Sequence, residues 1–150
     1  MEKKIVQVQE RTQQLIRQLL NVWESSVRAT HDFLSEEEII KIREYVPMAI
    51  ENVEHLIIAE KESGEPAAFM GIDGNRLEML FLSPEARGKG LGKRLLQYGI
   101  ETYNIQELTV NEQNPQAVGF YEHMGFQTYK RTDHDEEGNP YPLLYMRLSR

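Results

Sequence analysis

The sequence predicts one domain of mixed α/β class, and three observations support this prediction. The chain has 150 residues, of which 40% are apolar, which is enough to bury a sizeable core. Short extended runs separated by glycine-containing turns indicate β-strands. Other stretches place apolar residues at the three- and four-residue spacing of amphipathic helices. We therefore expect residues 1–150 to form a single domain.

The first third of the chain is expected to contain a strand and two helices. Apolar and polar residues alternate over residues 5–11, which indicates a strand, and residues 12–31 carry one apolar stripe at helical spacing. A second helical stripe begins at Ser35, where a serine followed by three glutamates is typical of a capping box. Pro47 should kink or divide this second helix, because proline lacks the amide hydrogen that the helix needs.

Three extended runs follow, at His55–Lys61, Pro66–Ile72 and Arg76–Leu82. Turn-forming residues separate them, Ser63-Gly64 in the first gap and Asp73-Gly74-Asn75 in the second. Short turns of this kind join neighbouring antiparallel strands, so these runs should form a meander.

The last part of the chain alternates helices with strands. Asn114 followed by a proline is typical of a helix start, and Gly125 is typical of a helix end. We expect helices at residues 91–102 and 115–124, and strands at residues 108–110, 126–131 and 143–148.

A glycine-rich loop lies between the third run of the meander and the next helix. Gly88, Gly90 and Gly92 alternate with cations and immediately precede a helix start, where amide hydrogens lack partners and the helix dipole is positive. Such a loop can hold an anion, most naturally a pyrophosphate. The alternative is a glycine-containing turn with solvated charges.

Two nucleotide-binding motifs do not fit this loop. A Walker loop needs a glycine and a hydroxyl residue where this chain has Arg87 and Arg94. A dinucleotide fingerprint needs a third glycine where Lys93 stands. Magnesium-nucleotide and nicotinamide chemistry are therefore not expected.

Arg87, Gly90 and Gly92 match the pattern Gln/Arg-x-x-Gly-x-Gly/Ala, and the loop resembles the acyl-CoA loop of the GCN5-related N-acetyltransferases (GNAT). A second match to the family begins 27 residues after Arg87 and reads Asn114-x-x-Ala117-x-x-Phe120-Tyr121-x-x-x-Gly125-Phe126. The segment from Trp23 to Leu34 resembles a poorly characterised bacterial subgroup of this family.

The resemblance implies a GNAT fold: a mixed seven-stranded sheet, splayed between strands four and five, with about four helices. It also implies acetyl-CoA as cosubstrate, and direct transfer of the acetyl group to a primary amine in a ternary complex. The alternative is a non-catalytic acyl-CoA-binding regulatory module. The cofactor-binding residues implied are Leu80, Phe81, Leu82, Arg87, Gly88, Lys89, Gly90, Leu91, Gly92, Lys93 and Asn114.

The resemblance makes Tyr121 the candidate general acid, which would protonate the departing thiolate. The alternative is an aromatic core residue on its helix. Glu78 is the candidate base, although Arg76 on the same strand face could simply pair with it. Some family members have a base on the following strand, where this chain has Thr109, so a water chain or an already neutral amine also remains open.

The acceptor site is expected near Trp23, His31 and Asp133. Trp23 lies on an apolar stripe that favours a core position, and His31 could be a local hydrogen-bonding residue. Asp133 begins an acidic run over residues 133–137 that could attract a cationic amine or could be a solvated turn. The acceptor could be a small amine or an amine of a peptide or protein.

The formal net charge of −7 argues against nucleic-acid and anionic-membrane partners, and thus against a transfer RNA substrate. The chain has no cysteine, no apolar run near the length of a membrane span and no signal-peptide pattern, so we expect a cytoplasmic protein. No histidine pair has metal-ligand spacing, and no metal is expected. The oligomeric state is open.

Overall fold

The computed structural model describes residues 3–149. One sheet runs through this part of the chain, with the strand order β1-β2-β3-β4-β5-β7-β6. The pair β4 and β5 is parallel and every other neighbouring pair is antiparallel, so the predicted mixed seven-stranded sheet is confirmed. The strands are β1 (Lys4–Gln7), β2 (His55–Glu60), β3 (Pro66–Asp73), β4 (Arg76–Leu82), β5 (Glu107–Asn111), β6 (Phe126–Thr132) and β7 (Leu143–Leu148).

The helices begin and end close to the residues that the sequence indicates. Ser35 caps one of them with a complete capping box, because its hydroxyl accepts from Glu38 N while its own amide donates to the Glu38 carboxylate over 2.8 Å. Pro47 divides the second helical stripe into two helices and lies in the first turn of the latter, where its missing amide hydrogen costs nothing. The helices are α1 (Gln13–Thr30), α2 (Glu36–Arg43), α3 (Val46–Asn52), α4 (Leu91–Tyr103) and α5 (Pro115–His123).

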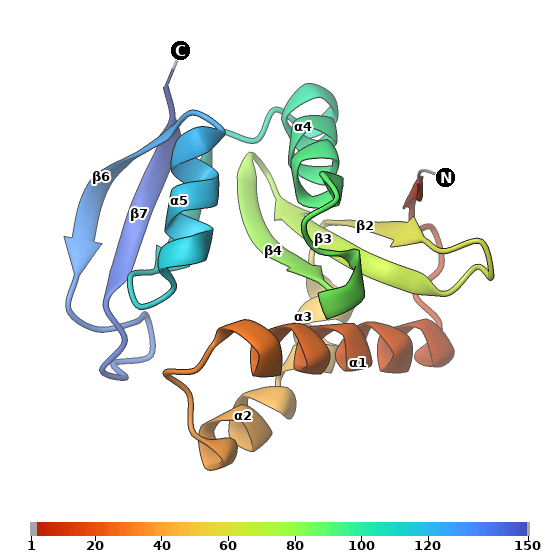
Figure 1. The fold of residues 1–150 in the computed structure, drawn as a ribbon, viewed down its shortest axis with the longest axis horizontal. Coiled ribbons are helices and arrows are strands. Elements are labelled where there is room, and N and C mark those ends of the chain that lie inside the picture. The colour runs from red at the N-terminus through yellow and green to blue at the C-terminus, as the bar shows by residue number, and fades with distance from the viewer. Residues whose placement is uncertain (1–2, 150) are drawn as a thin grey trace.

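The sheet separates two hydrophobic cores, and alternate residues of β2 point into each of them. Leu56 and Ile58 pack with α1, α2 and α3 on one face, whereas Ile57 and Ala59 pack with α4 on the other. The apolar side chains of α5 also pack against the second core. Figure 1 shows β6, β7 and α5 as a group to one side of β4 and α4.

The sheet splays at the junction of β4 and β5. These strands pair only at Arg76–Glu107 and Leu77–Leu108, although both continue beyond those residues. On its other edge β4 pairs with β3, where Ile72 faces Leu77 and Gly71 faces Met79, so Glu78 has no partner and forms a bulge. The splay implied by the family resemblance is therefore present, and the bulge lies at its base.

Candidate active site

A cleft of about 540 Å³ opens where β4 and β5 part. Its walls come from β4, β5, the end of α1, the glycine-rich loop with the first turn of α4, and α5. Both α4 and α5 begin just after the carboxyl ends of these two parallel strands, which is where open α/β sheets commonly bind ligands. The volume is within the range of small-molecule sites, about 300–1,000 Å³.

The glycine-rich loop forms the end wall of this cleft. Gly88 and Gly90 have φ angles of 75° and 80°, and apart from the adjoining residues no heavy atom of the described chain lies within 4 Å of the position that a Cβ would take at either residue. Gly90 is the N-cap of α4 and offers no side chain to its amides, so the N–H groups of the first turn need other acceptors. An anion can therefore approach the main-chain amides of this loop without meeting a side chain of Gly88 or Gly90.

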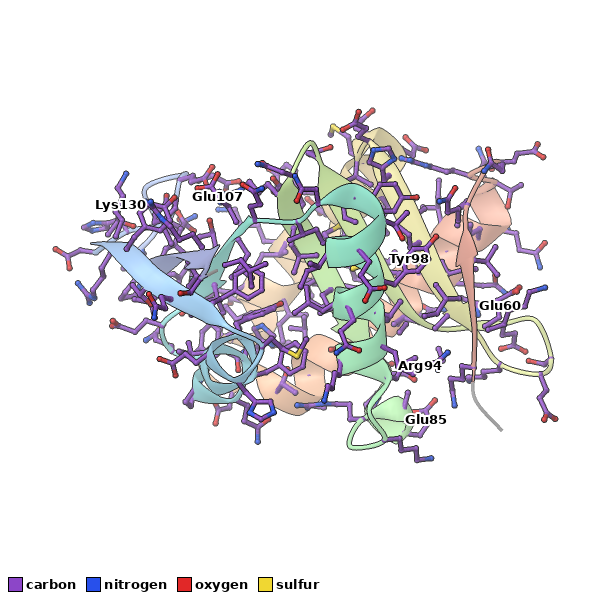
Figure 2. The ribbon with its side chains drawn as sticks, turned by 90° about the horizontal axis from the view of Figure 1, so that it is seen from above. Glu60, Glu85, Arg94, Tyr98, Glu107 and Lys130 are labelled. Carbon is purple, nitrogen blue, oxygen red and sulfur yellow. The ribbon has the colours of Figure 1, made fainter. Side chains whose placement is uncertain are left out.

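The cations around the loop point in different directions. Arg87 and Lys93 line the cleft, and Arg87 also donates to Gln116 Oε1 at 3.0 Å. Lys89 is exposed and does not line the cleft. Arg94 donates to the carbonyl oxygen of Lys3 at 3.0 Å, on the side of α4 that faces β1 (Figure 2). Positive charge in the cleft thus comes from Arg87 and Lys93.

Tyr121 lines the cleft from α5, with its ring packed against Phe120 and Phe126 at centroid distances of 5.2 and 6.1 Å. Burial raises the pKa of Tyr121 above its usual value, so the phenol keeps its proton at neutral pH. Within residues 3–149 its hydroxyl makes no hydrogen bond. The phenol can therefore donate to a group that enters the cleft.

Glu78 occupies the bulge of β4 and also lines the cleft, with 36% of its side chain exposed. Its Oε1 lies 3.2 Å from Arg76 Nε. Burial raises the pKa of Glu78; Arg76 opposes this shift, whereas Asp73 and Glu136 add to it. A carboxylate with a raised pKa at the edge of a cleft can serve as a proton acceptor near neutral pH.

His31 follows the last residue of α1 and lines the cleft opposite α5. Its Nε2 lies 3.5 Å from Nδ2 of Asn114, the N-cap of α5, and its Nδ1 lies 2.7 Å from the hydroxyl of Thr30. Burial and the nearby Arg87 lower the pKa of His31, while Asp32 opposes the shift. The imidazole is therefore held in its neutral form.

The other two residues expected at the acceptor site lie elsewhere. Trp23 is 4% exposed and packs in the core between the sheet and the helices α1 to α3, which is the alternative that its apolar stripe allows. Asp133 is exposed outside the cleft, with its carboxylate 2.5 Å from Arg131. The structure therefore brings His31, but not Trp23 or Asp133, to the residues expected to bind acetyl-CoA.

Several cleft residues were not indicated by the sequence patterns. Gln116 lies inside the second motif at one of its unspecified positions, so the motif does not select it. Ser26 is only 7% exposed and faces inward from α1, and its place as a polar residue within an apolar stripe is a signal that could have identified it. The cleft residues not predicted to have a role are Ser26, Thr30, Met79, Val110, Asn111, Gln116, Ala117, Phe120, His123 and Met124.

Over residues 3–149 no group of three or more His, Cys, Asp or Glu side chains is arranged to hold a metal ion. None of the helices in the same range is both long and apolar enough to cross a membrane.

A sheet that splays beside a glycine-rich loop able to accept an anion, with a tyrosine lining the opening, fits an acyl-CoA-dependent acetyltransferase. Residues 21–149 match the family described as Acetyltransferase (GNAT) domain, and the chain belongs to this family.

Curated relatives and solved structures agree with this assignment. Peptidyl-lysine N-acetyltransferase YjaB of Salmonella typhimurium is 40% identical over 126 residues, which cover 84% of this chain and 86% of that protein. The solution structure of apo-form YjaB from Escherichia coli has a TM-score of 0.87 and 35% identity, covering 98% of this chain and 97% of that one. The PaiA N-acetyltransferase of Thermoplasma acidophilum in complex with coenzyme A has the same fold, with a TM-score of 0.73 and 23% identity over all of both chains.

Proposed function

We propose that this enzyme transfers the acetyl group of acetyl-CoA directly to the amine of a lysine side chain in a peptide or protein, within a ternary complex. One observation carries the proposal: the same cleft holds an anion-binding loop, an unpartnered phenol at Tyr121 and the carboxylate of Glu78. The names of relatives about 40% identical support lysine as the acceptor. A cytoplasmic location, where acetyl-CoA is used, is part of the proposal.

Acetyl-CoA, the acetyl donor, would lie along the edge of β4 that parts from β5. Leu80, Phe81 and Leu82 line the cleft, and none of them pairs with β5 in the described part of the chain. Their main-chain groups on this edge can pair with the amides of the pantetheine arm, as a further strand would. The pyrophosphate would then reach the loop from Gly88 to Lys93, with Arg87 beside it. Asn114 would contact the amide arm from the other wall.

The reaction needs a nucleophilic amine and a leaving thiol. The amine nitrogen attacks the thioester carbonyl, and the proton lost by nitrogen goes to Glu78, directly or through one water. The tetrahedral intermediate collapses as the carbon–sulfur bond breaks, and Tyr121 gives its proton to the departing thiolate. A new carbon–nitrogen bond and free coenzyme A result. A backbone N–H near the bulge at Glu78 would stabilise the oxyanion.

The charge of the chain supports a cationic acceptor. A formal net charge of −7 attracts protonated amines and disfavours nucleic acid. The region around Glu78 also contains the carboxylates of Asp73 and Glu136, both of which act on the pKa of Glu78. A lysine entering on this side would meet negative charge before it reached the acetyl group.

Release of free thiol from acetyl-CoA tests the proposal. We expect turnover with a lysine-containing peptide and none with the same peptide acetylated at the lysine amine, while calorimetry confirms acetyl-CoA binding separately. A panel that includes a free polyamine distinguishes a small-amine acceptor from a lysine acceptor. Tight acetyl-CoA binding without turnover of any amine would instead favour the non-catalytic acyl-CoA-binding module.

A further inference from the structure

A chain of hydrogen bonds crosses the mouth of the cleft from α1 to α5. The hydroxyl of Thr30 donates to the carbonyl of Ser26 at 2.8 Å and lies 2.7 Å from His31 Nδ1. His31 Nε2 lies 3.5 Å from Asn114 Nδ2, and Asn114 Oδ1 accepts from the amide of Ala117 at 3.3 Å.

The two ends of this chain fix the direction of every bond in it. A carbonyl can only accept, so the Thr30 hydrogen is committed to Ser26 and the Thr30 oxygen accepts from His31 Nδ1. An amide N–H can only donate, so Asn114 turns its oxygen to Ala117 and its nitrogen to His31. His31 Nε2 must then be an unprotonated acceptor. Both ends therefore require the same neutral tautomer, with hydrogen on Nδ1.

We propose that His31 is a positioning residue for the acetyl-CoA-binding side of the cleft, acting by holding the amide of Asn114 in one orientation. This inference rests on the proposed contact between Asn114 and the amide arm of acetyl-CoA. With its oxygen bound to α5 and one N–H bound to His31, Asn114 keeps a single N–H donor for the ligand. The amide arm of acetyl-CoA would thus meet a hydrogen-bond donor of fixed direction.

The same bond joins the two sides of the splayed sheet. α1 packs on β3 and β4, whereas α5 packs on β5 and β6. Between the carboxyl ends of β4 and β5 there is no strand pairing in the described chain, so the contact of His31 with Asn114 joins the two sides where the main chains do not. His31 therefore acts through Asn114, in contrast to the acceptor contact expected from its place in the sequence.

The groups around His31 keep the imidazole neutral. The guanidinium of Arg87 faces it from the glycine-rich loop, and the only carboxylate acting on it is that of the adjacent Asp32 among residues 3–149. The ring of Phe33 lies against it at a centroid distance of 5.2 Å. A neutral ring is what the hydrogen-bond chain requires, because a doubly protonated imidazole would present a donor to Asn114.

Two pairs of variants test the inference. His31→Leu removes the acceptor for Asn114, and we expect the Kd for acetyl-CoA to rise about three- to tenfold, the equivalent of one net hydrogen bond. His31→Gln places an amide oxygen near the former Nε2 and should restore most of the affinity. Thr30→Val removes the hydroxyl that sets the tautomer and should weaken binding, whereas Thr30→Ser should not.

The kinetic constants separate this role from an acceptor contact. We expect the His31→Leu variant to change the KM for acetyl-CoA while the KM for a lysine peptide stays within about twofold, since a twofold change is under 0.5 kcal/mol. The reverse pattern, a raised peptide KM with unchanged acetyl-CoA binding, would overturn the inference. Equal loss in His31→Leu and His31→Gln would also overturn it, because only the leucine lacks the acceptor.

Nitrogen NMR of the ligand-free protein tests the tautomer without any enzyme activity. The long-range proton–nitrogen spectrum should show His31 as the Nδ1–H form, assigned by the signals that disappear in His31→Gln. A signal set of the Nε2–H form would contradict the inference. Neither this spectrum nor the Kd for acetyl-CoA requires turnover. Both measurements therefore test the inference even if the enzyme acetylates no lysine.

Discussion

Arg76 Nε lies 3.2 Å from Glu78 Oε1 at the base of the splay, and the same guanidinium donates to Thr109 Oγ1 on β5. Arg76 therefore links the two strands at the point where their main-chain pairing ends. It also places a fixed cation beside the candidate base. The pKa of Glu78 is nevertheless raised, because burial outweighs the attraction of Arg76.

Replacing Glu78 should change the pH dependence of the reaction. A carboxyl with a raised pKa becomes a base only above that raised value, so kcat/KM should fall as pH falls through it. We expect Glu78→Gln to lower kcat about 100-fold or more, as for loss of a general base, and to remove this part of the pH profile. Glu60→Gln, which makes the same change on β2 away from the cleft, should do neither (Figure 2). An unchanged profile in Glu78→Gln would exclude Glu78 as the base.

The same substitution should not destabilise the fold at neutral pH. The folded-state pKa of Glu78 lies above its unfolded value of 4.5, so the folded form binds more protons between the two values. Stability is therefore lost as pH rises through that window, and the loss persists above it. A neutral glutamine avoids this cost, so the Tm of Glu78→Gln at pH 7 should equal or exceed that of the wild type. A clear fall in Tm would show that the pairing with Arg76 outweighs burial.

The glycine-rich loop is tested by a side chain at Gly90. Gly90→Val would put atoms into the space where an anion is expected, and we expect acetyl-CoA affinity to fall more than about tenfold, or 1.4 kcal/mol. Valine also disfavours the left-handed conformation of this residue, at about 1–2 kcal/mol. Gly64→Val is the control, since its φ of 89° and open surroundings match those of Gly90 in a turn outside the cleft. Equal affinity in both folded variants would contradict the anion site.

Tyr121→Phe removes one hydroxyl and keeps the ring that packs against Phe120 and Phe126. If the phenol protonates the leaving thiolate, kcat should fall about 100-fold or more, as for other general acids, with little change in the Kd for acetyl-CoA. Tyr98→Phe removes a hydroxyl that is hydrogen-bonded to Gln7 on the far side of α4 and should leave kcat unchanged (Figure 2). Proportional losses of kcat and affinity in Tyr121→Phe would indicate a structural tyrosine.

Local patterns in the sequence were sufficient to predict the helices and strands and the conformation of the glycine-rich loop. The capping box at Ser35, the break at Pro47 and the cap at Asn114 each depend on residues within four positions, and each is present in the structure. The positive φ angles of Gly88 and Gly90 likewise follow from a pattern confined to one loop. The splay was implied by the resemblance, because pairing between β4 and β5 joins residues about thirty positions apart.

The pairings inside the cleft could not be predicted in the same way. His31 and Asn114 are 83 residues apart, and Arg76 and Thr109 are 33 apart, so no local pattern connects them. The bulge that frees Glu78 is a mismatch in register between β3 and β4, and neither strand shows it by itself. Trp23 illustrates the opposite case, because its apolar stripe already indicated the core position that it takes.

The acidic hairpin, residues 133–137, contains carboxylates with different surroundings, and Glu136 is the one that acts on the pKa of Glu78. Asp133 is paired with Arg131, and Asp135 accepts the amide hydrogens of Glu137 and Asn139, so substitution of Asp135 would also disturb the hairpin. Glu136 is 68% exposed and lies 4.0 Å from Arg76, beside Glu78. Glu136 is therefore the residue with which to test attraction of a cationic acceptor.

We expect Glu136→Gln to raise the KM for a lysine peptide about two- to threefold at low salt, because an exposed charge contributes at most about 1 kcal/mol. The difference should fade as ionic strength approaches about 0.15 M, where the Debye length is about 8 Å. The KM for acetyl-CoA should stay unchanged. Glu62→Gln removes the same charge from the turn between β2 and β3 and controls for net charge alone. A peptide KM that responds to neither salt nor Glu136→Gln would assign the hairpin a purely structural role and leave the choice of acceptor to the cleft walls.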